Sequence, residues 1–231
     1  MDEASPTRMV EACDGQMSQS RAIAVFVKTP GLSPVKTRLA EGIGAEKALE
    51  FYTLALECVT ELVQGVDATP IWAVAEKETS FFKNFETIWT DDGGLGQRQH
   101  HIYKTLLKKY DQVMLLGTDA PQLTSAMLEE AFEKLDTHDF VFGPSHDGGY
   151  NFMAGKKDIP LNVLTSVEYS QDTTREALCA KLSNYYMMPP FLDVDHIADL
   201  QITLEEMPDV PTKTQQKMID WAKETLISYA A

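Results

Sequence analysis

Short apolar runs alternate with longer amphipathic segments along most of this chain. Residues 22–28 read Ala-Ile-Ala-Val-Phe-Val-Lys, a continuous apolar run of the kind found in strands that are buried on both faces of a parallel sheet. Prolines at 30 and 34 end that run, and between 45 and 63 the apolar residues recur at steps of three and four, which is typical of a helix. The alternation predicts a single α/β domain with a mostly parallel, doubly wound sheet flanked by helices.

The same pattern places the elements along the sequence. Strands are predicted at 22–28, 70–75, 87–89, 112–117, 139–142 and 150–153. Helices are predicted at 45–63, 96–110, 125–135, 173–183, 197–206 and 213–228, with a short helical stretch around Phe81. Ligands of such sheets bind beyond the carboxyl ends of the strands, where the motifs described below are expected to lie.

Charge and composition exclude several classes of protein. The chain has 231 residues, with 20 Lys and Arg against 35 Asp and Glu, a net charge of -15. Such a surface repels phosphate backbones, so we expect no nucleic-acid partner. No apolar run approaches the roughly 20 residues of a membrane helix, so we expect no membrane span. The three cysteines form no CxxC pair, which argues against a structural zinc site or a disulfide framework.

The first 20 residues are polar and acidic and lack the apolar core of a secretory signal. We therefore expect a disordered tail over residues 1–20, a folded domain over residues 21–231 and a cytoplasmic location.

Residues 21–40 carry four cations and no acidic residue in this strongly acidic chain: Arg21, Lys28, Lys36 and Arg38. A loop that leads from a strand into a helix offers free backbone N–H groups, and nearby cations complete a phosphate site. The alternative is a solvated basic turn. A Walker A loop is excluded because Val35 stands where that motif needs a glycine.

Three acidic segments follow later strands. Asp119 directly follows the apolar run 112–117, a suitable place for a carboxylate that holds a divalent cation, although it could also cap the turn that ends at Pro121. Asp147 lies in a Gly-rich turn, which is explained either by a hairpin or by close approach to a ligand. Asp193 and Asp195 precede a helix, where they either cap it or provide a second metal ligand.

Together these segments resemble a bacterial glycosyltransferase-like family with the GT-A fold, a Rossmann-like nucleotide-diphospho-sugar transferase fold. The resemblance rests on a KTRL run (36–39), an LGxR segment (95–98), GTDxP (117–121), GPxxDGGY (143–150) and a DVD–DL ending (193–200). More distantly, the chain resembles molybdenum-cofactor nucleotidyltransferases and phospholactate guanylyltransferase. Two positions depart from the family pattern: Gln97 replaces an acidic residue, and Tyr169-Ser170 replaces a Trp-Ser pair near the acceptor region.

The resemblance implies a transferase that uses a nucleotide or nucleotide-sugar donor, a small-molecule acceptor and a divalent metal, Mg²⁺ or Mn²⁺. It implies Asp119 and Asp195 as metal ligands, Asp119 and Asp147 as catalytic residues, and an acceptor side at Gly148, Gly149 and Tyr150. The residues implied to bind the nucleotide are Lys28, Thr29, Lys36, Thr37, Arg38, Gly96, Arg98 and Thr118.

The expected reaction is transfer of a sugar from a nucleotide-sugar. The alternatives are transfer of a nucleotide from a nucleoside triphosphate to a phosphorylated acceptor, or nucleotide binding without catalysis.

Overall fold

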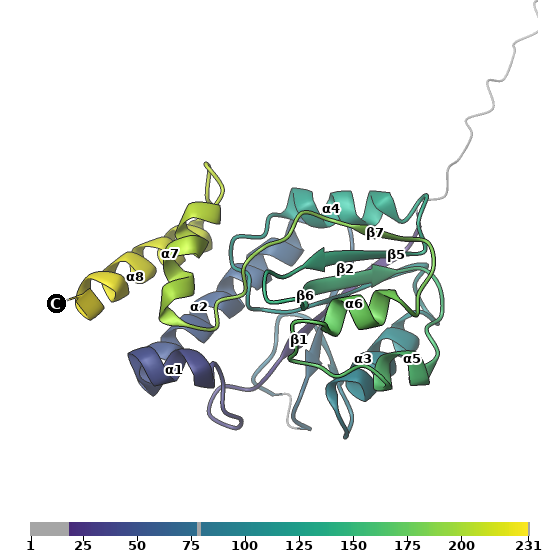
Figure 1. The fold of residues 1–231 in the computed structure, drawn as a ribbon, viewed down its shortest axis with the longest axis horizontal. Helices are drawn as coiled ribbons and strands as arrows, with labels where there is room; N and C mark the ends of the chain where they lie inside the picture. The colour runs from purple at the N-terminus through teal and green to yellow at the C-terminus, as the bar shows by residue number, and fades with distance from the viewer. Residues whose placement is uncertain (1–18, 78–79, 231) are drawn as a thin grey trace, which may run out of the picture.

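The computed structural model describes residues 19–77 and 80–230, and the predicted tail falls almost entirely outside these ranges. Over the described residues a seven-stranded sheet forms the centre of the molecule (Figure 1). Its strands are β1 (Arg21–Val27), β2 (Thr69–Val74), β3 (Glu86–Trp89), β4 (Gln112–Leu116), β5 (Phe140–Pro144), β6 (Tyr150–Gly155) and β7 (Tyr185–Met187).

The strands lie in the order β3-β2-β1-β4-β6-β5-β7. The first four neighbours, from β3 to β4, pair in parallel. β6 runs antiparallel to both β4 and β5, and β7 pairs in parallel with β5. All strands except β6 therefore point the same way, which confirms the predicted mixed, mostly parallel sheet.

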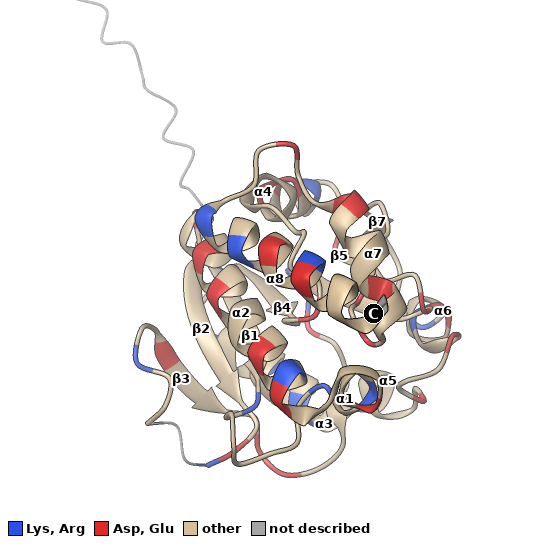
Figure 2. Ribbon diagram, turned by 90° about the vertical axis from the view of Figure 1, so that its left-hand side faces the viewer, with Lys and Arg blue, Asp and Glu red and all other residues tan. Residues whose placement is uncertain are grey.

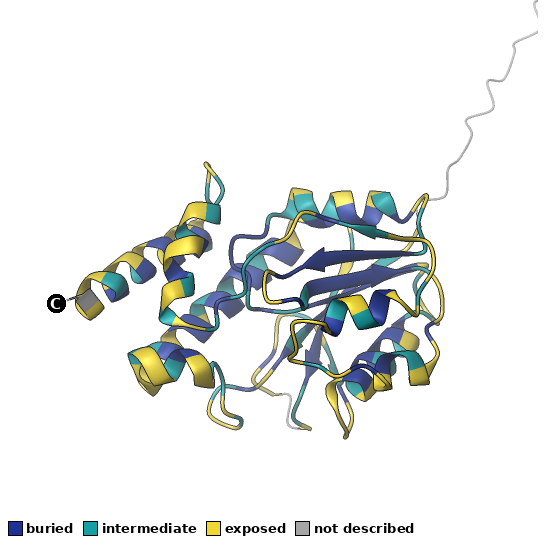
Figure 3. Ribbon diagram, viewed as in Figure 1, coloured by how far each residue is buried: buried dark blue, intermediate teal, exposed yellow. Residues whose placement is uncertain are grey.

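Helices cover both faces of the sheet. The helices of the described residues are α1 (Thr37–Ile43), α2 (Ala45–Gln64), α3 (Leu95–Leu106), α4 (Ser125–Lys134), α5 (Leu161–Thr165), α6 (Thr174–Cys179), α7 (Ile197–Glu206) and α8 (Lys213–Ala230). One apolar core joins α2 and α4 to the sheet, and a second joins α3, α5 and α6 to the opposite face. Figure 3 shows the strands buried between these layers.

The two cores explain why the first strand is apolar from residue 22 to residue 27. Ile23, Val25 and Val27 contribute to the core under α2, whereas Ala22 and Ala24 contribute to the core under α3. Because alternate side chains of a strand point to opposite faces, a strand covered on both faces has no position left for a polar residue.

A third apolar core attaches the C-terminal helices α7 and α8 to the outer face of α2. This core contains Phe51, Ala55 and Cys58 of α2 together with Met218 and Ala222 of α8. The core also includes the fully buried Val194, which lies in the segment before α7. The C-terminal helices thus hold residues 192–196 against the central domain. Acidic residues are spread along α2, α7 and α8 (Figure 2).

Most of the predicted elements agree with the structure, and the differences are short. Residues 80–85 around Phe81 form turns and no helix, because the aromatic rings of Phe82 and Phe85 pack individually against Trp72. The short elements α1, α5 and β7 were not predicted, since each is too brief to show a period in the sequence. Among the described residues, no helix has both the length and the apolar character required to cross a membrane.

Candidate functional site

A cavity of about 400 Å³ lies where β1, β2 and β4 end. Its apolar wall includes Phe26, Ala73, Ala75, Leu95 and Leu115, from the strands and the first turn of α3. Its polar residues are Lys28, Lys36, Tyr52, Thr90, Arg98, Gln99, Thr118, Asp119, Tyr150, Asn151 and Asp195. This is the edge at which doubly wound sheets bind ligands.

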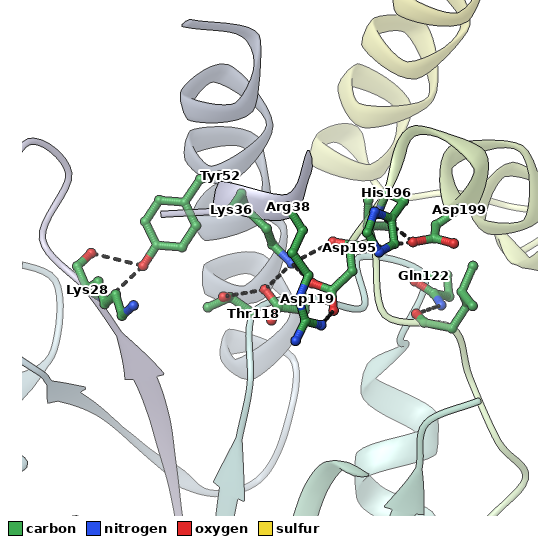
Figure 4. A network of polar contacts seen from close by, with 12 residues as sticks. Lys28, Lys36, Arg38, Tyr52, Thr118, Asp119, Gln122, Asp195, His196 and Asp199 are labelled. Carbon is green, nitrogen blue, oxygen red and sulfur yellow. Dashed lines mark hydrogen bonds and ion pairs between the residues drawn. The ribbon is translucent and has the colours of Figure 1, made fainter. Parts of the chain in front are cut away.

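Tyr52 and Glu76 fix the start of the loop that follows β1. The Tyr52 hydroxyl accepts a hydrogen bond from the Lys28 N–H at 2.8 Å and donates one to the Lys28 carbonyl at 2.9 Å (Figure 4). The Thr29 N–H donates to the Glu76 carboxylate at 2.7 Å. Thr29 is therefore buried in the base of the loop, whereas the Lys28 side chain is exposed and lines the cavity.

Lys36 makes internal ionic contacts at this edge. Its ammonium lies 2.7 Å from Asp119 Oδ1 and 3.8 Å from Asp195 Oδ1, and it donates to the Val194 carbonyl at 2.6 Å (Figure 4). The side chain is 5% exposed. Its backbone is in the left-handed region, with a φ of 47°. Lys36 thus lies at the end of the loop, as predicted, but its ammonium is buried against acidic residues.

The next two predicted phosphate-binding residues lie in the first turn of α1. Arg38 forms an ion pair with Asp195 at 2.7 Å and stays half-exposed. Thr37 is exposed at the start of α1 and does not line the cavity. In this arrangement the cations at 36 and 38 bind residues 194 and 195 and so hold the acidic segment 193–195 against the sheet.

Asp119 follows β4, with Thr118 beside it. The Asp119 backbone carbonyl accepts a hydrogen bond from the Val194 N–H at 3.0 Å, which joins the two acidic segments directly. The Thr118 hydroxyl donates to Asp119 Oδ1 at 3.3 Å. The Asp119 carboxylate remains 44% exposed beside the cavity. A carboxylate in this position is accessible to a cation that arrives with a ligand.

Asp193 is the most strongly perturbed of the clustered carboxyl groups. Its Oδ1 is out of contact with solvent and has no hydrogen-bond partner among the described residues. Burial, followed by the nearby charges of Asp119 and Asp147, raises the pKa of Asp193 well above its ordinary value, although Lys36 opposes the shift. A buried oxygen without a partner is costly, and a bound cation would satisfy it.

The predicted metal ligand Asp195 has a different environment. Both of its carboxylate oxygens face cations, Oδ2 toward Arg38 and Oδ1 toward Lys36. Asp193 therefore fits the role of second ligand better than Asp195. As the side chains stand, no group of three His, Cys, Asp or Glu residues in the described part of the chain is arranged to hold a metal ion. Magnesium is commonly held by one or two carboxylates together with substrate phosphates, so the pair Asp119 and Asp193 suits such an ion.

The Gly-rich turn after β5 is a tight structure around Asp147. The Asp147 carboxylate accepts hydrogen bonds from the Ser145 hydroxyl and from the Gly149 N–H. Gly148 has a φ of 89°, and a Cβ there would lie 1.8 Å from the Asp172 carbonyl oxygen, so no other residue fits. Asp147 itself is exposed and acts electrostatically on Asp193. The turn thus places the Asp147 carboxylate near Asp193.

Arg175 stabilises this turn, a role that no pattern in the sequence predicted. Its Nη1 donates to the Ser145 and Gly149 carbonyls, both at 3.0 Å, and its backbone N–H donates to the Gly148 carbonyl. An isolated arginine in a short helix gives no periodicity or motif that would reveal such a role.

Glu206 was missed for the same reason. Its carboxylate accepts hydrogen bonds from the Leu192 N–H and from the Gln122 side-chain amide, and it lies 3.2 Å from His146 Nε2.

Two residues of the LGxR segment have different roles: Gly96 packs between helices, and Arg98 lines the cavity. Gly96 is buried, and a Cβ there would lie 2.4 Å from the Leu164 carbonyl oxygen, so this glycine allows α5 to approach α3. Arg98 lines the cavity, and its Nε donates to the Gly93 carbonyl at 3.0 Å. Of the two predicted nucleotide-binding residues here, Arg98 alone lies at the cavity.

A family model described as an uncharacterized protein conserved in bacteria (DUF2064) matches residues 57–171. The sequence has no match among curated proteins.

Two of the solved structures that are similar to this chain illustrate its fold. One, from Desulfovibrio desulfuricans G20, is named provisionally as a nucleotide-diphospho-sugar transferase; it superposes with a TM-score of 0.81 at 21% identity, over 91% of this chain and 98% of that chain. The other, Rv0371c from Mycobacterium tuberculosis H37Rv, gives a TM-score of 0.51 at 12% identity, over 81% and 98% of the two chains. The chain therefore has the nucleotide-diphospho-sugar transferase fold that its motifs predicted.

Proposed function

We propose that this protein is a metal-dependent transferase that binds a nucleotide-activated donor in the cavity beside Asp119 and moves a sugar from it to a small acceptor. The observation that carries the proposal is Asp119, a carboxylate at the rim of a cavity bordered by cations. Its charge acts on the nearby Asp193, whose buried Oδ1 lacks a hydrogen-bond partner among the described residues. The structurally similar protein named provisionally as a nucleotide-diphospho-sugar transferase supports the same class of donor.

The two ends of the cavity match the two parts of such a donor. The apolar wall formed by Ala73, Ala75 and Leu95 suits the flat face of a nucleobase. Lys28 and Arg98 place positive charge on the cavity wall, where it can pair with phosphate oxygens. In an acidic protein this local charge is what permits an anionic ligand to bind.

Asp119 and Asp193 would hold the divalent cation, with donor phosphates as its remaining ligands. When bound, such an ion neutralises the charge that develops on the leaving diphosphate. Lys36 now neutralises Asp119, so we expect its ammonium to turn toward the phosphates when a cation replaces it. In the transfer, an acceptor hydroxyl oxygen forms a bond to the anomeric carbon as the carbon–oxygen bond to the diphosphate breaks. The hydroxyl proton passes to a base, for which Asp147 is the exposed carboxylate at hand.

Calorimetric titration with nucleoside diphosphates and nucleotide-sugars, with and without Mn²⁺, tests the donor site. We expect metal-dependent binding in the wild type, loss of the metal dependence in Asp119→Asn and Asp193→Asn, and normal behaviour in Asp209→Asn, an exposed control. Metal-dependent binding that survives in both site variants contradicts the assignment.

The products separate the reaction classes. Slow release of a nucleoside diphosphate from a nucleotide-sugar supports sugar transfer, whereas release of pyrophosphate from a nucleoside triphosphate identifies nucleotidyl transfer. Tight binding with neither product, over a panel of acceptors, identifies a nucleotide-binding protein without catalysis.

A further inference from the structure

Asn151 is a polar residue in a strand that is otherwise apolar or aromatic. It belongs to β6, and it is 6% exposed. The pairing of β6 with β5 shifts at this residue. Phe152 lies opposite Gly143, whereas Tyr150 lies opposite Pro144, the next residue along β5, so Asn151 is the extra residue of a β-bulge. Bulges are common next to functional sites, because they turn a side chain away from the regular alternation of the strand.

Two backbone carbonyls fix the orientation of the Asn151 amide. Its Nδ2 donates to the Phe191 carbonyl at 3.3 Å and to the Pro144 carbonyl at 3.5 Å. The reverse orientation would place the amide oxygen against two acceptors, so the nitrogen must face the carbonyls and Oδ1 must face away from them.

The amide oxygen is the polar atom of Asn151 that is still free to bind a ligand. Its backbone carbonyl already accepts a hydrogen bond from the Gly117 N–H at 2.8 Å. No described residue donates a hydrogen bond to Oδ1, and this atom is not sealed from solvent as Asp193 Oδ1 is. Because Asn151 lines the cavity, we infer that Oδ1 is available there as a hydrogen-bond acceptor.

The strand order places Asn151 at the opposite end of the cavity from the apolar wall. Ala73 and Ala75 of that wall lie on β2 and directly after it, β1 and β4 come next in the sheet, and β6 follows β4. Neighbouring strands lie about 4.8 Å apart, so β2 and β6 are separated by about 14 Å. Asp119 lies between the two ends, since it follows β4. A nucleotide-sugar whose base lies against the wall and whose diphosphate lies beside Asp119 therefore carries its sugar toward Asn151.

We propose that Asn151 is a specificity-determining residue whose Oδ1 accepts a hydrogen bond from a hydroxyl group of the transferred sugar. This inference rests on the proposed function for the nature of the donor, and it names the part of the donor that the residue selects. A sugar hydroxyl supplies the proton that Oδ1 lacks. A ligand without that hydroxyl covers the oxygen and leaves it unpaired, so the site itself disfavours such a ligand.

The two anchoring carbonyls hold Asn151 in place for this role. Pro144 ends β5 just before the turn that carries Asp147, and Phe191 leads into the acidic segment 192–196. The amide is thus fixed by the same two segments that carry the proposed base and the second proposed cation ligand. An acceptor that is already oriented loses little conformational entropy when the ligand binds.

Binding of matched ligands tests the proposal. Calorimetry in Mn²⁺ begins with ADP, GDP, CDP and UDP and continues with the glucose, galactose and mannose conjugates of the diphosphate that binds best. Analogues of the preferred conjugate, in which fluorine replaces one sugar hydroxyl at a time, keep the size of the sugar but cannot donate. Asn151→Leu removes both amide groups, and Asn151→Asp keeps an acceptor. Asn162→Leu, at an exposed asparagine of α5, is the matched control.

We expect Asn151→Leu to weaken the preferred conjugate about tenfold and to leave the free diphosphate within about twofold of the wild type. The fluorinated analogue that lacks the hydroxyl bonded to Oδ1 should bind the wild type and Asn151→Leu alike. Asn151→Asp should keep the preference for the conjugate over the diphosphate, because its added charge weakens both anionic probes by a similar factor.

Three results would overturn the proposal. The first is equal weakening of conjugate and diphosphate by Asn151→Leu, which indicates a structural role or, if the Mn²⁺ dependence also disappears, a cation ligand. The second is a preference for the conjugate that Asn151→Asp loses as fully as Asn151→Leu. The third is a wild type that binds every fluorinated analogue as tightly as the parent conjugate.

A second measurement needs no variant. In protein labelled with nitrogen-15 at asparagine, the Asn151 side-chain amide protons should exchange slowly, because two carbonyls hold them. With Mg²⁺ present, the conjugate should shift these resonances more than the free diphosphate does. Rapid exchange, or equal shifts with both ligands, would contradict the role of Asn151 while metal-dependent diphosphate binding leaves the proposed function standing. A wild type that binds no diphosphate refutes the proposed function, and this inference with it.

Discussion

Replacement of Lys36 by methionine is expected to destabilise the fold even without any ligand. The ammonium is almost fully buried, and its loss leaves the Asp119 carboxylate beside the buried carboxyl of Asp193 and removes the donor to the Val194 carbonyl. Removal of one partner from a fully buried ion pair costs about 3–5 kcal/mol. Asp119 is 44% exposed, so water recovers part of that cost, and we expect a loss of about 2–3 kcal/mol.

Thermal unfolding of the metal-free protein measures this loss. For a chain of this size, 1 kcal/mol corresponds to roughly 2–4 °C in the melting temperature, so Lys36→Met should melt about 4–12 °C below the wild type. Lys108→Met, an exposed lysine after α3, serves as the control and should melt within a degree or two.

A double-mutant cycle with Asp119→Asn identifies the cause. Once the carboxylate is neutralised, loss of the lysine should cost less, with a coupling free energy of about 1–2 kcal/mol. If Lys36→Met melts at the same temperature as the wild type, or if the free-energy costs of the two substitutions simply add, Lys36 is not the counterion of Asp119. The account of this edge of the sheet is then wrong.

Three further substitutions test other parts of the structure. Asp193 has a folded-state pKa above its ordinary 3.8, so the wild type should lose stability as the pH rises from about 4 through that raised pKa. Melting temperatures measured over this pH range should decline less in Asp193→Asn than in the wild type. Gly96→Ala places a Cβ 2.4 Å from a backbone carbonyl and should cost about 1–3 kcal/mol in urea unfolding, whereas Gly42→Ala, whose Cβ would make only ordinary contacts, should cost nothing. Arg175→Gln releases the turn 145–149 and should lower kcat more than it weakens nucleotide binding; equal effects on both would contradict a bracing role.

The sequence was sufficient to predict the sheet because its signal is local. Strands β1 and β4 are buried on both faces of the sheet, and each appears in the sequence as a continuous apolar run. Asp119 follows shortly after the second of these runs. The prediction of a mixed, mostly parallel sheet was therefore correct, and Asp119 does lie at the cavity rim.

The site itself depends on contacts between distant segments, which no local pattern reveals. Lys36 meets residues 194 and 195 across more than 150 positions, so the sequence could show a basic run but not that acidic residues neutralise it. The choice between Asp193 and Asp195 likewise depends on which carboxyl faces cations, and Arg175 acquires its role only through the turn that it contacts.

The attachment of α7 and α8 to the outer face of α2 has a consequence for the order in which the protein becomes functional during synthesis. Val194 is held in the core formed by these helices, and its two backbone groups bond Lys36 and Asp119. A chain made only as far as residue 192 contains every strand of the sheet, yet it lacks Asp193, the Val194 carbonyl that accepts from Lys36, and the helices that position both. The C-terminal helices must therefore be made before the proposed site is complete, later than the last strand of the sheet.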